Sequence, residues 1–112
     1  MQAVLFADDG PPALSSINAG EVYCKLSRRQ GPDPAEAFWR AATSGRLPLR
    51  LYSATDARVR RAAALKARFR LSYAGAFAMG LAAELGRPLV TGDEEIRAAA
   101  AEPGITLDWL RA

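Results

Sequence analysis

The stretch LSYAGAFAMGLAAELGRPLVTGD, residues 71–93, contains the signals for one helix and for the strand that follows it. Ser72 is a favourable helix N-cap, and Gly86 is a favourable residue just past a helix end. Apolar side chains recur between them at helical spacing, which predicts a helix over this interval. The run PLVT at 88–91 predicts a short buried strand. A helix that leads into a buried strand is typical of an α/β fold.

One residue in the first turn of that expected helix is unusual. Position 75 is a glycine, which costs a helix about 1 kcal/mol relative to alanine. A carboxylate at this place would accept hydrogen bonds from free N–H groups and would suit the positive end of the helix dipole. Since the chain uses alanine freely elsewhere, Gly75 needs a specific explanation.

The rest of the chain alternates between expected strands and helices. Further strands are expected over 13–17, 47–52 and 105–110, and further helices are expected to begin at Asn18 as a cap, at Asp33–Pro34, at Thr55 and at Asp93. This alternation predicts a single domain over residues 1–112. We expect a three-layer α/β/α fold with a mainly parallel sheet and helices on both faces.

The composition restricts the chemistry that the chain can perform. Its 112 residues carry a net charge of +3 and include one cysteine and no histidine. Ser-His-Asp catalysis, Cys-His catalysis and zinc sites built on histidine are therefore excluded. Acids, bases and metal ligands must come mainly from Asp and Glu, which favour magnesium or manganese. No apolar run reaches the roughly 20 residues that span a bilayer, and no secretory signal is present, so we expect a cytoplasmic protein.

Two acidic residues lie at or near the junction between an expected strand and the helix that follows it. Glu21 comes shortly after the strand at 13–17, and Asp93 comes directly after the strand at 88–91. In a parallel sheet, binding sites lie at the carboxyl ends of the strands. We therefore expect Glu21 and Asp93 to approach each other although they are far apart in the sequence.

Three stretches, taken in order, resemble one known family. They are SSINAGEVYCKL at 15–26, LKARFRLSYAGAFAMGLAAELGRPLVTGDEEI at 65–96 and ITLDWL at 105–110. Together they resemble the PIN domain, and most nearly the VapC-type toxins of bacterial toxin–antitoxin pairs. The resemblance covers about residues 14–110.

The resemblance implies a metal-dependent ribonuclease. PIN domains gather carboxylates that bind magnesium or manganese, and a metal-activated water then cleaves RNA. On this basis Glu21 and Asp93 are the expected catalytic and metal-binding acids. Glu94, with Glu95 beside it, is expected to assist at the metal, while Asn18 and Thr91 are expected to support the site by hydrogen bonds.

Two departures from the family pattern put this activity in doubt. The family carries an acid in the first turn of its L-S-x-x-D-A segment, and Gly75 occupies that place here. The family also begins with a strand that ends in Asp, and no segment here matches it. Asp8 or Asp9 could be that acid, but neighbouring parallel strands need a crossover of about a dozen residues or more, and Ala13 follows too soon. We therefore expect the amino end to be the tail of a helix, with the first strand missing from the sheet.

Two hypotheses about function follow. The chain is a weakened or inactive endoribonuclease of the VapC type, because two of the expected acids are absent. Alternatively, it is a catalytically dead binding module for RNA, for an antitoxin-like protein or for its own copy. A homodimer is expected, because a partner strand could fill the vacant centre of the sheet. The basic residues of the expected helix at 55–69 are candidates for contact with RNA phosphates.

Overall fold

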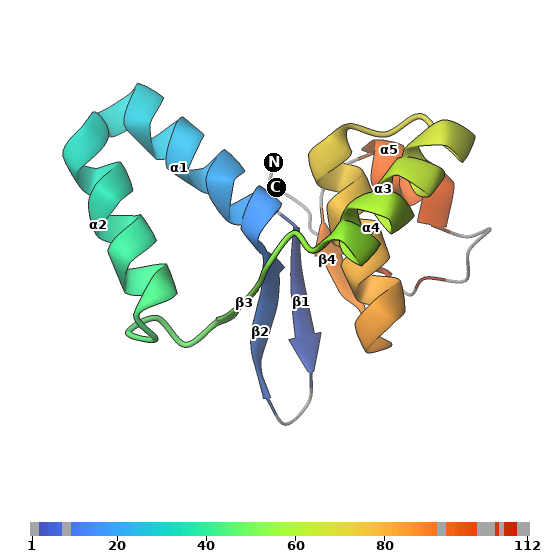
Figure 1. The fold of residues 1–112 in the computed structure, drawn as a ribbon, viewed down its shortest axis with the longest axis horizontal. Helices are drawn as coiled ribbons and strands as arrows, with labels where there is room; N and C mark the ends of the chain where they lie inside the picture. Colours follow the sequence, from blue (N-terminus) through green and yellow to red (C-terminus); the bar gives the residue numbers. More distant parts are fainter. Residues whose placement is uncertain (1–2, 8–9, 92–93, 101–104, 106, 110–112) are drawn as a thin grey trace.

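The computed structural model describes residues 3–7, 10–91, 94–100, 105 and 107–109. In chain order the elements are β1 (Ala3–Ala7), β2 (Gly10–Ser15), α1 (Ser16–Gln30), α2 (Pro32–Thr43), β3 (Arg50–Tyr52), α3 (Asp56–Arg68), α4 (Tyr73–Leu85), β4 (Leu89–Thr91), α5 (Glu94–Ala100) and β5 (Leu107–Trp109). Strands and helices alternate after β2, as Figure 1 shows. The expected α/β class is confirmed.

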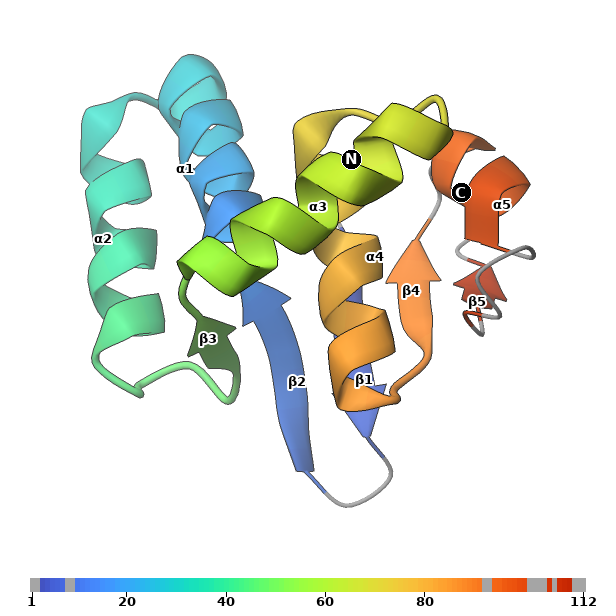
Figure 2. The ribbon, with the colours of Figure 1, turned by 45° about the vertical axis from the view of Figure 1, so that its right-hand side comes forward.

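The sheet has five strands in the order β3-β2-β1-β4-β5. β2 pairs in parallel with β3, and β4 pairs in parallel with β5. β1 lies in the centre and is antiparallel to both of its neighbours, β2 and β4. Four strands therefore run in one direction and β1 alone runs against them (Figure 2), so two of the four pairings are parallel and two are antiparallel.

The expectation of a missing central strand is wrong, and so is the expected helix tail at the amino end. The segment Ala3–Ala7 fills the centre as β1. Ala7 pairs with Gly10, and Leu5 pairs with both Ala13 and Leu89. The prediction considered only parallel pairing, which needs a long crossover. An antiparallel pair needs only a hairpin, and the short segment between β1 and β2 is enough for one.

α3, α4 and α5 bury one apolar core against the sheet. α4 lies against β1, β2 and β4, α3 packs on α4, and α1 and α2 form a helical hairpin beside them (Figures 1 and 2). Ala13 of β2, Met79 of α4, Leu89 of β4 and Ile96 of α5 are all completely or almost completely buried in this core. None of the described helices is long and apolar enough to cross a membrane.

The helix ends show which local signals were interpreted correctly. Ser72 caps α4 as expected, and Gly86 ends it in the left-handed conformation, with φ at 62°. Asn18 does not cap α1, because the Ser15 side chain accepts the backbone N–H groups of Ile17 and Asn18 instead. α2 begins at Pro32, earlier than the expected start at Asp33–Pro34.

Candidate functional site

The carboxyl ends of β2 and β4 lie at the same edge of the sheet. Both strands run antiparallel to β1, which lies between them. α1 begins directly after β2 ends at Ser15, and α5 begins shortly after β4 ends at Thr91. The amino end of α4 lies at this edge too, because the Asn18 side chain of α1 contacts the Ala74 carbonyl of α4 (Figure 2). We call this region the carboxyl edge.

Glu21 lies on the helix that leaves this edge. It is half-buried and stands three positions after Asn18 in α1, so the two side chains share one face of the helix. The first turn of α1 contains no acid, and neither does the first turn of α4. In the described part of the edge, Glu21 is therefore the acid placed closest to the junction of strand and helix on the α1 side.

Gly75 is buried at the amino end of α4. Its N–H group donates to the Ser72 hydroxyl oxygen at 3.0 Å. A Cβ atom built on Gly75 would lie 3.2 Å from that oxygen and 3.4 Å from Cγ1 of Ile96. Ile96 belongs to α5 and is 1% exposed. The place where the family pattern has a carboxylate is thus bordered by an apolar side chain.

Asn18 is a buried amide that joins two helices at the carboxyl edge. Its side chain is 3% exposed, and its Nδ2 donates to the Ala74 carbonyl oxygen at 3.0 Å. Its Oδ1 is buried, and no donor among the described residues bonds to it. A buried acceptor without a partner costs about 1–3 kcal/mol, a cost that a bound water or ion would relieve.

Several predicted site residues lie outside what the structure describes. Asp93, Asp8 and Asp9 are among these residues, and the side chains of Glu94 and Thr91 are not described either. The backbone around them still places β4 and α5 at the carboxyl edge. In contrast, Ala7 and Gly10, which flank Asp8 and Asp9, pair at the opposite edge, where β2 begins.

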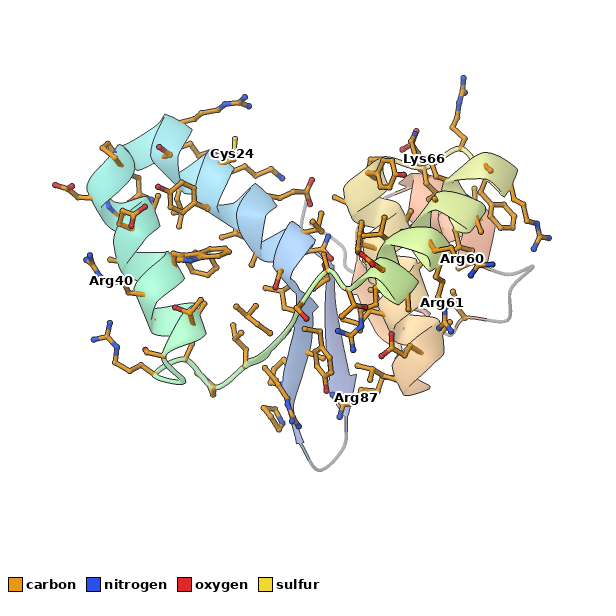
Figure 3. All side chains as sticks on the ribbon, in the orientation of Figure 1. Cys24, Arg40, Arg60, Arg61, Lys66 and Arg87 are labelled. Atoms are coloured by element: carbon orange, nitrogen blue, oxygen red, sulfur yellow. The ribbon has the colours of Figure 1, made fainter. Side chains whose placement is uncertain are left out.

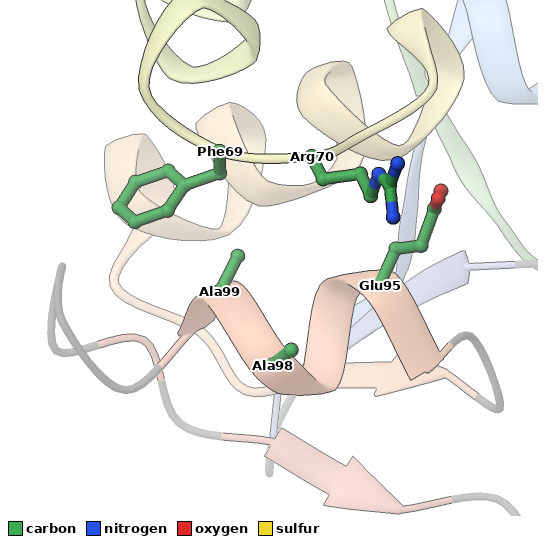
Figure 4. A pocket seen from close by; sticks show the side chains of 5 residues that line it. All are labelled: Phe69, Arg70, Glu95, Ala98 and Ala99. Atoms are coloured by element: carbon green, nitrogen blue, oxygen red, sulfur yellow. The ribbon is translucent and has the colours of Figure 1, made fainter.

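Glu95 lies beside a surface pocket next to the carboxyl edge. The pocket has a volume of about 290 Å³ and is lined by Phe69, Arg70, Glu95, Ala98 and Ala99. The Arg70 and Glu95 side chains point toward each other across it (Figure 4). Glu95 is exposed here, so it faces solvent and this pocket.

The described oxygen donors at the carboxyl edge are of the chemical type that binds a hard divalent cation. Mg²⁺ and Mn²⁺ prefer carboxylate and amide oxygens, which Glu21 and Asn18 supply. Gly75 has no side-chain oxygen and supplies no donor. Within the described ranges, no three Asp, Glu, His or Cys side chains come together as a possible metal site.

The expected basic surface forms on α3, although some of its cations have structural partners. Arg58 donates to both carboxylate oxygens of Glu84, at 3.0 and 2.8 Å, and to the Ser53 carbonyl. This ion pair holds the pKa of Glu84 below its usual value. Arg60, Arg61 and Lys66 are exposed along the same helix (Figure 3).

Comparison with known proteins identifies one match. A family model described as the PIN domain matches residues 2–102, which is most of the chain. No curated protein and no solved structure shows a significant match. The matched segment includes β1, which the sequence alone had left outside the family pattern.

Proposed function

We propose that this chain, which belongs to the PIN-domain family, descends from the VapC-type endoribonucleases of toxin–antitoxin pairs. We also propose that its own cleavage activity is weak or lost. PIN domains have a nuclease-type fold and generally use divalent metal ions. The proposal keeps RNA as the ligand and a cytoplasmic setting, and it assigns the loss of activity to the carboxyl edge.

The environment of Gly75 carries this proposal. The position lacks the carboxylate that the family pattern has there, and its Cβ direction leads to the buried side chain of Ile96. A missing carboxylate removes one negative charge from a site whose purpose is to hold a doubly charged ion. The contact with Ile96 also means that a carboxylate at 75 would approach an apolar group, which penalises its ionised form.

The remaining acids would hold a magnesium or manganese ion only weakly. The proposed ligands are Glu21, Asp93 and Glu94, with Thr91 and Asn18 in support. A bound ion would supply a water of lowered pKa and would stabilise negative charge on the phosphoryl group. Because an ion that binds weakly is rarely present, we expect slow cleavage.

A specific observation favours the binding-module alternative. α3 presents Arg60, Arg61 and Lys66 to solvent, and the chain as a whole carries a net charge of +3. Exposed cations along one helix can contact RNA phosphates without any metal. On this alternative the chain binds RNA, an antitoxin-like protein or a second copy of itself and does not cleave.

The decisive experiment compares cleavage with binding in the same samples. RNA is incubated with the wild-type chain and with Asp93→Asn at several concentrations of Mg²⁺ and Mn²⁺, while RNA binding is followed by fluorescence anisotropy. We expect RNA binding by both proteins and cleavage near background for both. Metal-dependent cleavage by the wild-type chain that Asp93→Asn abolishes would show an intact nuclease and would overturn the proposal.

A further inference from the structure

The Asn18 side chain is held in one orientation by its contact with α4. Nδ2 donates to the Ala74 carbonyl oxygen at 3.0 Å. Rotating the amide by half a turn would place two acceptor oxygens against each other, so the amide group cannot exchange its nitrogen and oxygen without loss. Nδ2 therefore faces Ala74, and Oδ1 is the atom of the amide that has no hydrogen-bond partner among the described residues.

The backbone at this point does not need the Asn18 side chain. Ser15 already caps α1 by accepting the N–H groups of Ile17 and Asn18. Capping is the usual structural reason for an asparagine at a helix start, and it does not apply here. The bond to Ala74 uses one N–H of Nδ2, while the buried Oδ1 has no partner among the residues that the structure describes.

We propose that Asn18 Oδ1 is a neutral oxygen ligand for a divalent cation at the carboxyl edge. Amide oxygens are ligands for hard cations such as Mg²⁺ and Mn²⁺. Asn18 shares a face of α1 with Glu21, and through Ala74 it lies beside Gly75, where the carboxylate is absent. The inference rests on the proposed function, because it names an oxygen that remains at the weakened metal centre.

This position explains why a weak cation site can persist without the acid at 75. Oδ1 contributes coordination but no charge, so it does not compensate for the missing negative charge. It avoids the desolvation penalty that a buried carboxylate at this position would carry in the absence of metal. The edge can therefore fold without the ion and still accept one.

A wild-type measurement tests the inference without any substitution. Asn18 is the only asparagine in the sequence, so its side-chain amide gives one identifiable pair of NMR signals. We expect a small amount of Mn²⁺ to broaden the Asn18 Nδ2 signals first and to leave those of Gln30, at the far end of α1, unchanged. If the Asn18 signals stay sharp while Mn²⁺ broadens others elsewhere, the inference is overturned.

Substitutions at the same position give a second test. Asn18→Asp keeps the size of the side chain and adds a charge, and Gln30→Glu adds the same charge at the exposed end of the same helix. Without metal, Asn18→Asp should be less stable, because its carboxylate faces the Ala74 carbonyl. By calorimetry we expect Asn18→Asp to bind Mn²⁺ about tenfold more tightly than wild type, and Asn18→Ala to lose the wild-type binding.

The outcomes separate this inference from the proposed function. Unchanged Mn²⁺ binding in both Asn18→Ala and Asn18→Asp overturns the role of Oδ1, whatever the chain does to RNA. Efficient cleavage of RNA by the wild-type chain overturns the proposed loss of activity. In that case, the NMR signals of Asn18 and the Mn²⁺ affinities of the Asn18 variants still decide the role of Oδ1.

Discussion

Gly75 of α4 faces Ile96 of α5 so closely that a Cβ atom on the glycine would lie 3.4 Å from Cγ1 of the isoleucine. A side chain at position 75 would therefore make van der Waals contact between two helices whose amino ends both lie at the carboxyl edge. In this chain, the two helices meet through apolar packing at the place where the family pattern puts a metal-binding acid. On the proposed function, the same position would decide both the charge of the metal centre and the packing of the two helices.

We predict that Gly75→Ala stabilises the protein. Alanine is favoured over glycine inside a helix by about 1 kcal/mol, and its Cβ would make an ordinary contact with Ile96. The Ser72 oxygen, at 3.2 Å, must move slightly, which reduces the gain. Urea denaturation should therefore show an increase in the free energy of unfolding of up to about 1 kcal/mol. A clear decrease would mean that α4 and α5 pack more tightly than described.

The ion pair between Arg58 and Glu84 should make part of the stability depend on pH. The pKa of Glu84 is lower in the folded chain than in the unfolded chain, mainly because Arg58 donates hydrogen bonds to its carboxylate. Its contribution is therefore present above the unfolded pKa and is lost as the pH falls through the folded pKa. We expect Glu84→Gln to reduce stability at pH 7 by up to about 1 kcal/mol, because the pair is only partly buried.

A double-mutant cycle with Arg58→Gln isolates this coupling. At pH 7 the two substitutions together should cost less than the sum of their separate costs. At a pH below the folded pKa of Glu84 the coupling should disappear. A coupling energy that is equally large at both pH values would contradict the assignment to this ion pair.

β1 should be essential for the sheet because it is the strand that joins β2 to β4. Leu5 pairs with residues on both sides, so its N–H group belongs to the interior of the sheet. Leu5→Pro removes that donor and should abolish cooperative unfolding as measured by circular dichroism. Leu5→Val keeps the donor and is the matched control. A Leu5→Pro chain as stable as Leu5→Val would mean that β1 does not occupy the centre.

RNA binding should depend on α3 through charge. We expect Arg60→Gln to weaken binding about equally for different RNA sequences. The slope of the logarithm of the binding constant against the logarithm of the salt concentration should fall in magnitude by about one. Arg40→Gln changes an exposed arginine on α2, away from α3 (Figure 3), and serves as the control. Equal effects of the two substitutions in anisotropy titrations would argue against a binding surface on α3.

Local signals in the sequence predicted much of the fold. The cap at Ser72 and the left-handed Gly86 fixed the ends of α4 correctly, because each depends only on neighbouring backbone groups. β1 was missed because the prediction considered only parallel pairing, for which the segment before Ala13 is too short, whereas β1 pairs antiparallel with both neighbours. Asn18 was taken for a cap because its residue type suits one, while Ser15 performs that role.

The site could be predicted only in part. The position of Gly75 in the first turn of α4 followed from the spacing of the segment, and the structure confirms it. Its neighbour Ile96 could not be foreseen, because a contact between two helices leaves no local pattern in the sequence. The buried Oδ1 of Asn18 was missed for a related reason, since it depends on the distant carbonyl of Ala74. The roles of Asp93 and Glu94 remain predictions.

The most direct test of the central claim is a calorimetric titration of the wild-type chain, Gly75→Asp and Gly75→Asp/Ile96→Val with Mn²⁺, with Ile96→Val alone as the control. The claim is that the missing charge at position 75 limits the metal centre. We predict weak binding by the wild-type chain and by Ile96→Val, tighter binding by Gly75→Asp, and the tightest binding by the double variant, in which the apolar neighbour is smaller. Tight binding by the wild-type chain, or no gain in either variant with Asp at 75, would contradict it.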